Sequence, residues 1–259
     1  IVFEGLDTHA EIFINDYFIG NTDNMFRQWS FEVPNSILET ENVLNVNFLS
    51  VAEYDRQKLS QVGIAIPDER VFSRKSPYHG GWDWAPKYQT VGIYKDVYLQ
   101  YWEKLRILDI KLEQDVIADT VAYLTAFIKL ESENYYNGSI EIISPENKFD
   151  TIKYNLEIFE GIHTYPVLIE INNPVLWWCN GLGDAHLYDF KFNIRTKFRL
   201  VSQTVQTGLR KIDLVTNLDD DGQSFYFILN GLPVFAKGAN WVPAEYFNGS
   251  NTEQNYREL

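Results

Sequence analysis

The sequence predicts an all-β protein that is built from β-sandwiches. Apolar and polar residues alternate with a period of two along most of the 259 residues, which is the pattern of half-buried strands. Aromatic residues make up 15% of the chain, and aromatic side chains favour strands. No long amphipathic helix is expected before Asn251. These observations together predict strands joined by turns.

The first hundred residues contain strand patterns that are separated by turn residues. Residues 10–14 and 17–19 predict a hairpin around the turn Asn15–Asp16. Further strands are expected at residues 44–48, where apolar residues alternate with asparagine, and at 97–101. The dipeptide Glu103–Lys104 follows the last of these strands, and we expect a domain joint there.

A second set of strands follows, and it is dense enough for a complete sandwich. Residues Val121, Tyr123, Thr125 and Phe127 alternate and share one face of a strand. Further strands are expected at residues 139–143, 167–171, 188–194 and 200–207. About seven short strands in about 105 residues, with turn signals between them, are typical of a β-sandwich.

A third region begins near Lys211. Its alternating apolar residues lead into Asn230–Gly231, which predicts a hairpin turn of type I′. Residues 252–259 are polar and suit the start of a helix. Only 35 residues remain from Phe225 to the end, far fewer than the ~250 of a complete α/β barrel.

Charge and composition exclude several classes of function. The formal net charge is −14, which opposes binding to nucleic acid phosphates or to an anionic membrane surface. No run approaches the ~20 apolar residues of a membrane span, and no signal or transit segment is visible. The single cysteine, Cys179, cannot form an internal disulfide.

Two motifs that suggest bound ions are better explained as surface structure. The stretch Asn217–Gly222 resembles the start of a calcium-binding loop, but its twelfth position is Ile228 rather than glutamate. A solvated acidic turn is therefore expected there. The four histidines show no metal-ligand spacing, so no metal site is expected.

The segment Tyr78–Lys87 carries the strongest chemical signal. It contains Trp82, Asp83 and Trp84 after two glycines and before a proline. A carboxylate between two indoles can accept hydrogen bonds from sugar hydroxyls, while the indoles cover apolar sugar faces. The alternative is a tryptophan-rich loop that packs under a sandwich, with Asp83 capping a turn. Spacing alone favours this alternative.

Four blocks in the same order make the sequence resemble glycoside hydrolase family 2, in its β-mannosidase branch. The blocks are Phe3–Thr8 with Ile14–Asn15 and Gly20; Gly80–Pro86 with Thr90–Val97; Asn173–Gly183 with Leu187–Tyr188; and Phe225–Pro243. Cys179 stands where the family usually has proline. The Trp82–Trp84 tripeptide and Ala239–Pro243 favour mannosidases over galactosidases and glucuronidases.

The resemblance implies three structural regions. Residues 1–104 are expected to form a jelly-roll sugar-binding domain whose amino-terminal strands are missing. Residues 105–210 are expected to form an immunoglobulin-like β-sandwich. Residues 211–259 are expected to begin a truncated (β/α)8 barrel with its first strand.

The resemblance also implies an activity for a longer parent enzyme. Members of this branch hydrolyse terminal, non-reducing β-D-mannose residues by a retaining mechanism that needs no cofactor and uses two glutamates on late barrel strands. Glu245, Glu253 and Glu258 match neither catalytic motif, so both glutamates are expected beyond Leu259 and the chain alone is expected to be inactive. Two alternatives remain: a stand-alone carbohydrate-binding module, or a fragment of a family 2 β-galactosidase or β-glucuronidase.

The family pattern assigns substrate contact to Trp82, Asp83 and Trp84, which would reach a terminal mannose. Trp241 would line the same pocket or pack at the barrel base. Arg74 and Lys75 would pair with Asp83 or lie on the surface. The expected partner is a carbohydrate, and a homo-oligomer stays open. The compartment is not determined, although a periplasmic or secreted location is favoured, or a lysosomal one in a eukaryote.

Overall fold

The computed structural model describes residues 1–247 and 250–258, with the side chain of Asp219 left out. The chain divides into two compact units. The first unit contains Ile1–Tyr101 and the segment from Asn240 onward, and the second contains Trp102–Ala239. The carboxy-terminal segment therefore groups with the amino-terminal strands, although more than a hundred residues separate them in sequence.

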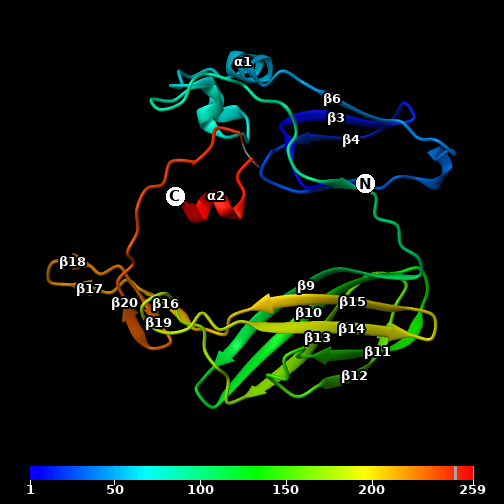
Figure 1. Cartoon of the computed structure of the whole chain (residues 1–259), viewed down its shortest axis with the longest axis vertical. Coiled ribbons are helices and arrows are strands. Elements are labelled where there is room, and N and C mark those ends of the chain that lie inside the picture. Colours follow the sequence, from blue (N-terminus) through cyan, green and yellow to red (C-terminus); the bar gives the residue numbers. More distant parts are fainter. Residues whose placement is uncertain (248–249, 259) are drawn as a thin grey trace. The chain divides into compact units, whose positions relative to one another are not determined.

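Small antiparallel sheets form the framework of the first unit (Figure 1). The strand orders are β5-β1-β8, β2-β7 and β4-β3-β6. The strands are β1 Val2–Phe3, β2 Leu6–Asp7, β3 His9–Ile14, β4 Tyr17–Asp23, β5 Trp29–Ser30, β6 Leu44–Phe48, β7 Gly92–Ile93 and β8 Val97–Tyr98. Side chains from these strands and from Ile1 form one core, whose buried members are Ile1, Phe3, Leu6, Ile12 and Ile14.

The hairpin expected around Asn15–Asp16 is confirmed as the β3–β4 turn. Both residues have a positive φ, 49° and 66°, as a type I′ turn requires. The side-chain amide of Asn15 also donates a 2.8 Å hydrogen bond to the carbonyl of Ile37, so the hairpin turn is fixed to the neighbouring 3-10 turn.

The described residues before Asn251 contain no long amphipathic helix, but they contain a short helix that the sequence pattern did not predict. Helix α1 spans Val51–Gln61, and short 3-10 turns lie at η1 Asn35–Ile37, η2 Glu69–Phe72 and η3 Pro77–Gly80. Ser50 caps α1 by accepting a 3.3 Å hydrogen bond from the Glu53 amide. Only Val51 and Asp55 of this helix are buried, so it has no apolar stripe that periodicity could detect.

The second unit contains a seven-stranded sandwich of the immunoglobulin type, as expected. One sheet has the order β13-β10-β9 and the other β12-β11-β14-β15. The strands are β9 Leu105–Ile117, β10 Val121–Ser132, β11 Tyr136–Ile143, β12 Ile152–Ile158, β13 Gly161–Asn172, β14 Tyr188–Thr196 and β15 Leu200–Thr207. Side chains from both sheets interdigitate in one core, with Leu124, Ile128, Ile140, Phe190 and Phe192 fully buried.

Short strands follow the sandwich within the same unit. They are β16 Ile212–Val215, β17 Leu218–Asp219, β18 Gly222–Gln223, β19 Tyr226–Leu229 and β20 Leu232–Val234. Asn230 and Gly231 have positive φ values of 48° and 85°, which confirms the predicted hairpin turn. The acidic stretch forms the β17–β18 turn.

The expected first barrel strand stays a prediction. Strands β16, β19 and β20 pair only antiparallel, and with one another, whereas barrel strands pair in parallel. Residues 240–247 and 250–258 contain no strand, and the expected terminal helix is present as α2 Glu253–Glu258. Across the described residues, no helix is both long and apolar enough to cross a bilayer.

Candidate functional site

Residues 82–85 form a tight turn that presents two tryptophans and a carboxylate, and we call it the tryptophan turn. The Trp82 amide donates to the Ala85 carbonyl at 3.0 Å, and the Ala85 amide donates back at 3.2 Å. Neither Asp83 nor Trp84 has a positive φ, so the turn accepts ordinary side chains at both central positions.

The side chains of the tryptophan turn are available to a ligand. Trp82 is 55% exposed and Trp84 is 39% exposed, and Asp83 is also exposed. Within the described part of the chain, the Asp83 carboxylate has no hydrogen bond or ion pair. Asp83 therefore does not cap a turn, and its oxygens are free to accept hydrogen bonds from a bound molecule.

Arg70 supports the turn from the side that precedes it. Its Nη1 donates to the carbonyls of Gly81 at 2.5 Å and Pro77 at 3.1 Å, and its guanidinium lies 5.5 Å from the Trp82 ring centroid. Asp68 holds Arg70 through a 2.7 Å bond to Nε, and this hydrogen bond lowers the pKa of Asp68.

Gly80 and Gly81, the two glycines before the tryptophan turn, make the contact with Arg70 possible. A Cβ at Gly80 would lie 2.1 Å from Cδ of Arg70, so only glycine lets the arginine pass beneath the loop. Gly81 has a φ of 97°, which other residues rarely adopt. The glycines therefore admit a neighbouring side chain and a special backbone conformation.

Tyr246 supports the turn from the side that follows it. Its hydroxyl donates to the Tyr88 carbonyl at 2.6 Å and accepts from the Tyr88 amide at 3.0 Å. The carbonyls of Pro86 and His79 lie 3.2 and 3.3 Å from the same oxygen. The Tyr78 ring lies between this tyrosine and the tryptophan turn, with its centroid 5.1 Å from that of Trp84.

A buried ion pair lies next to this loop. The side chains of Lys75 and Asp7 are 6% and 5% exposed, and Lys75 Nζ donates to Asp7 Oδ1 at 2.5 Å. Nζ also donates to the carbonyl of Thr90 at 2.7 Å and to its hydroxyl at 2.9 Å. The expectation that Lys75 pairs with Asp83 or lies on the surface is therefore wrong, whereas the Arg74 side chain is exposed.

His79 joins the ion pair to the carboxy-terminal segment. Its Nε2 lies 3.0 Å from the carbonyl of Tyr246, which can only accept, so Nε2 carries the proton. Its Nδ1 lies 3.1 Å from the Thr90 hydroxyl. Burial lowers the pKa of His79, and burial also lowers the pKa of Lys75 although Asp7 opposes that shift.

A second buried cluster contains serine, histidine and aspartate without the order of a catalytic triad. The Ser73 hydroxyl donates to Asp55 at 2.5 Å and lies 2.9 Å from His9 Nε2. The serine therefore sits between the other two, whereas a nucleophilic serine needs histidine between itself and the aspartate. Burial raises the pKa of Asp55 and lowers that of His9. This cluster holds α1 to the sheet.

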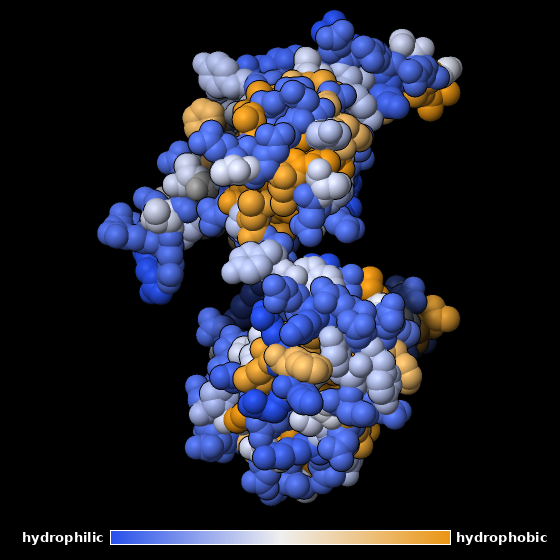
Figure 2. Space-filling model, turned by 90° about the vertical axis from the view of Figure 1, so that its right-hand side faces the viewer, coloured by the Kyte–Doolittle hydropathy of each residue, from blue (hydrophilic) through white to orange (hydrophobic). Residues whose placement is uncertain are grey.

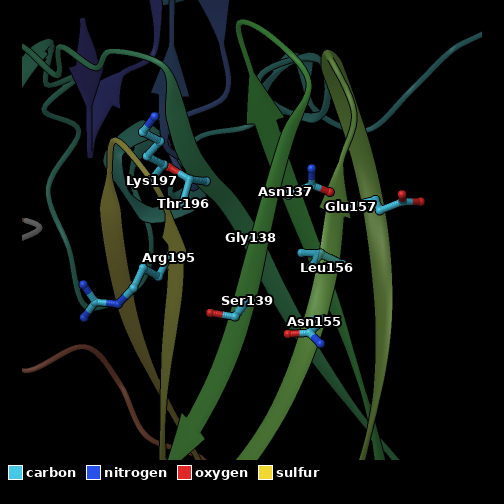
Figure 3. Close-up of a pocket in the computed structure, with 9 residues that line it drawn as sticks. All are labelled: Asn137, Gly138, Ser139, Asn155, Leu156, Glu157, Arg195, Thr196 and Lys197. Carbon is cyan, nitrogen blue, oxygen red and sulfur yellow. The ribbon is translucent and has the colours of Figure 1, made fainter.

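Two cavities lie away from the tryptophan turn. One of about 300 Å³ borders Asp7, His79 and Thr90, whose polar atoms already bond to one another. The other, of about 610 Å³, is a shallow depression over strands β11, β12 and β14 (Figure 3). It is lined by Asn137, Gly138, Ser139, Asn155, Leu156, Glu157, Arg195, Thr196 and Lys197, with no aromatic side chain for stacking.

The structure does not join Trp241 to the tryptophan turn. Trp241 is 67% exposed, and it has no ring contact or hydrogen bond to any described residue. The residues from 1 to 247 and 250 to 258 also contain no cluster of three or more side chains suited to a metal ion.

Sequence reasoning missed the residues that hold the site. Tyr246 reaches Tyr88 across 158 positions and Lys75 reaches Asp7 across 68, so no local spacing indicates either contact. The pair Gly80–Gly81 was a usable signal, because two adjacent glycines indicate a close approach. It did not identify Arg70 as the group that approaches.

Comparison with known proteins identifies the family. The family model described as "Glycosyl hydrolase 2 galactose-binding domain-like" matches residues 1–95, and the model "Glycosyl hydrolases family 2" matches residues 105–210. Together these matches cover most of both units. The chain belongs to glycoside hydrolase family 2.

Within this family the chain is similar to β-mannosidases. It is 29% identical to beta-mannosidase B of Emericella nidulans and 30% identical to beta-mannosidase of Capra hircus, over 100% of the chain but only 31% and 32% of those proteins. The crystal structure of β-D-mannosidase from Dictyoglomus thermophilum matches 99% of the chain and 32% of its own, at 33% identity and a TM-score of 0.90. The chain thus spans about a third of these relatives.

The fold extends beyond mannosidases. An exo-chitosanase from Amycolatopsis orientalis matches 93% of the chain and 27% of its own length with a TM-score of 0.69, at 18% identity. A likeness at this identity concerns the fold alone. The same fold therefore occurs in a structure named a β-D-mannosidase and in one named an exo-chitosanase.

Proposed function

We propose that this chain is the non-catalytic, amino-terminal portion of a retaining exo-β-mannosidase that removes terminal, non-reducing β-D-mannose residues. Relatives at about 30% identity over the whole chain are named β-mannosidases. The observation that carries the proposal is the tryptophan turn, because it offers, between two exposed indoles, a carboxylate that bonds to none of the described residues.

The tryptophan turn would bind the sugar ring by two complementary means. The oxygens of Asp83 accept hydrogen bonds from adjacent hydroxyls, and a bond to a charged acceptor is stronger than one to a neutral acceptor. The indoles of Trp82 and Trp84 cover the apolar C–H face of the ring. Trp241 would either line the same pocket or pack at the base of a barrel in the longer protein.

Bond cleavage would take place in the remainder of the enzyme. A retaining mechanism needs two carboxyl groups about 5–5.5 Å apart, one as acid and base and one as nucleophile. We assign both to the part of the parent protein outside this chain, and no cofactor takes part. The role of this chain is then to hold the terminal sugar while those groups act.

A stand-alone carbohydrate-binding module is the second candidate. The same turn favours it, since an exposed carboxylate and two indoles can bind a sugar without a catalytic barrel. Calorimetry of the 259-residue chain with mannose separates the two functions. A module binds the sugar tightly by itself, whereas one wall of a larger pocket binds it weakly.

The proposed function predicts that the isolated chain releases no nitrophenol from an aryl β-mannoside. Removal of a nucleophile or a general acid costs several orders of magnitude in rate, and the chain would lack both. The measurement is hydrolysis across purification fractions. Activity that follows the 259-residue polypeptide would contradict the assignment of both carboxyls to the remainder.

Asp83→Asn in the full-length enzyme tests the binding role. The exchange keeps the shape but replaces one acceptor by a donor and removes the charge. A hydrogen bond to a charged group contributes about 1.5–3 kcal/mol, so kcat/KM on an aryl β-mannoside should fall about 10- to 100-fold. The melting temperature should not change, because Asp83 has no partner in the described part of the protein.

Asp96→Asn is the matched control, since Asp96 is exposed in the same unit. Its kcat/KM should stay at the wild-type value. Activity of the Asp83 variant within about threefold of wild type would refute the contact role. Aryl β-galactoside and β-glucuronide, tested beside the mannoside, decide between the branches of the family.

A further inference from the structure

We propose that Tyr246 is a positioning residue for the tryptophan turn. The effect of Tyr246 on catalysis rests on the proposed function, whereas its effect on the order of the loop does not. Tyr246 belongs to the carboxy-terminal segment that groups with the first unit. It contacts backbone on both sides of the turn and leaves the turn itself free for a sugar.

The Tyr246 hydroxyl joins the two stems of the loop. His79 precedes the tryptophan turn, while Pro86 and Tyr88 follow it, and all three carbonyls lie within 3.3 Å of the hydroxyl oxygen. The single hydroxyl proton goes to Tyr88, the nearest carbonyl at 2.6 Å. The oxygen also accepts the Tyr88 amide, so both backbone groups of Tyr88 depend on one side chain.

Tyr246 is itself fixed to a buried frame. Its carbonyl accepts a 3.0 Å hydrogen bond from His79 Nε2, and the other nitrogen of His79 faces the Thr90 hydroxyl at 3.1 Å. Thr90 belongs to the Lys75–Asp7 network, which is buried. The tyrosine therefore transmits the position of this network to the exposed loop.

The ring of Tyr246 extends the support towards the indole. It meets Tyr78 edge-to-face at 5.6 Å between centroids, and Tyr78 meets Trp84 at 5.1 Å. Aromatic pairs at these separations stabilise each other beyond their buried area. The orientation of Trp84 thus depends on a residue that does not touch it.

Fixing the loop in advance favours binding. A loop that is ordered before the ligand arrives does not lose its conformational entropy on association. Without the hydroxyl, the stems at His79 and at Pro86–Tyr88 would separate more easily, and Asp83 would be held less well. We therefore expect weaker sugar binding after a change at a residue that the sugar does not contact.

Tyr246→Phe in the full-length enzyme is the test, because it keeps the ring and removes only the hydroxyl. Hydrogen exchange, measured without substrate, should accelerate at the amides of residues 82–85, 87 and 88 and not in β3. The variant loses two neutral hydrogen bonds at Tyr88 and no contact to the sugar, so KM on an aryl β-mannoside should rise about 3- to 10-fold, with kcat within about twofold. Tyr101→Phe is the control, since Tyr101 is 92% exposed.

Any of three results overturns the proposal. Unchanged exchange at residues 82–88 means that the hydroxyl does not hold the loop. Equal acceleration in β3 means that Tyr246 only stabilises the whole unit. Faster loop exchange with an unchanged KM means that the loop does not need this support to bind the sugar. A wild-type enzyme that does not cleave mannosides contradicts the proposed function, while the exchange result still decides whether Tyr246 holds the loop.

Discussion

At the scale of single residues, the first unit depends on a buried ion pair that local sequence patterns do not reveal. Lys75 and Asp7 lose nearly all contact with water, and each carries a charge whose burial is unfavourable. The pair persists because Thr8 and Thr90 donate further hydrogen bonds to the carboxylate. Removing one partner therefore destabilises the fold strongly, because it leaves a buried charge without its counterion, whereas replacing both partners by apolar residues would cost much less.

Replacing Lys75 should lower the denaturant concentration at which the chain unfolds. Lys75→Met leaves the Asp7 carboxylate buried without its cation, which typically costs about 3–5 kcal/mol. Urea unfolding followed by tryptophan fluorescence measures the change in the free energy of unfolding. Lys87→Met is the control because Lys87 is exposed, and it should change stability little. A loss below about 1 kcal/mol for Lys75→Met would show that water replaces the ammonium.

The burial of His79 predicts a pH dependence of stability. His79 is only 1% exposed and faces Thr90, Tyr246, Lys75 and Asp7. Burial lowers its folded-state pKa, so the unfolded chain binds a proton more readily. The stability that comes from the neutral ring is complete above the unfolded pKa of about 6.5 and is lost as the pH falls below it.

His79→Gln should make this pH dependence weaker. The measurement is the urea midpoint at intervals from about pH 7.5 to about pH 5.5, a window above the ordinary carboxylate pKa values. The wild-type midpoint should fall across this window, and the fall should be smaller in the variant. His163→Gln serves as the control because His163 is exposed. Parallel curves for wild type and His79→Gln would contradict the prediction.

At the scale of elements, the hairpins were predicted and helix α1 was missed. The turns Asn15–Asp16 and Asn230–Gly231 carry their own determinants, because their residue types tolerate the positive φ that the turn requires. Helix α1 has no apolar stripe, so the periodicity of the sequence gave no sign of it. Its only signal was local, since Ser50 followed three residues later by Glu53 has the spacing of a capping box, of which the structure shows the serine half.

The candidate site divides in the same way between local and distant determinants. The density of glycine and tryptophan around Asp83 predicted an unusual loop, and the exposed tryptophan turn lies there. Its supports come from elsewhere in the chain, since Arg70 lies 11 positions from Gly81 and Tyr246 lies 158 from Tyr88. Only the tertiary fold brings such groups together, so the residues that position the turn could not be found from spacing.

The conformation of the loop predicts a contrast between two glycines. Gly81→Ala places a Cβ at a φ of 97°, which costs about 1–2 kcal/mol. Gly63→Ala adds a methyl group to open space without a positive φ, so it should be neutral or stabilising by up to about 1 kcal/mol. Urea unfolding of the two variants measures the difference. Equal stability would show that the loop around residue 81 adapts without strain.

At the scale of the whole molecule, the sequence predicted the all-β architecture, and it predicted the family more specifically. Alternation predicted sandwiches, and both units are built of antiparallel sheets. The family followed from four blocks in a fixed order, which hydrophobic patterning cannot supply, and the two family models confirm it. The first barrel strand was predicted by the resemblance alone, and the antiparallel pairing of β16, β19 and β20 leaves it untested.

Large apolar side chains are exposed at many positions of the described surface. Figure 2 shows hydrophobic residues gathered in patches on the viewed face rather than scattered singly. After the sandwich, Leu218 is 84% exposed, Phe225 is 72% exposed and Phe235 is 83% exposed. Exposed apolar side chains favour association when they lie close enough together to form a contiguous patch. The net charge of −14 opposes association through repulsion between copies.

Exposed apolar side chains favour association and the net negative charge opposes it, so we expect association that depends on salt. The purified 259-residue chain should be mainly monomeric at about 10 mM salt, where the screening length is ~30 Å, and should associate at about 0.5 M salt, where repulsion is screened. Light scattering after size exclusion measures the mass at each concentration. Phe235→Ser should shift the association to higher protein concentration, because it removes one of the most exposed apolar side chains. Phe26→Ser, at a 60% exposed position outside this region, should have a smaller effect. A monomer at every salt concentration would show that the exposed side chains are too dispersed to form an interface.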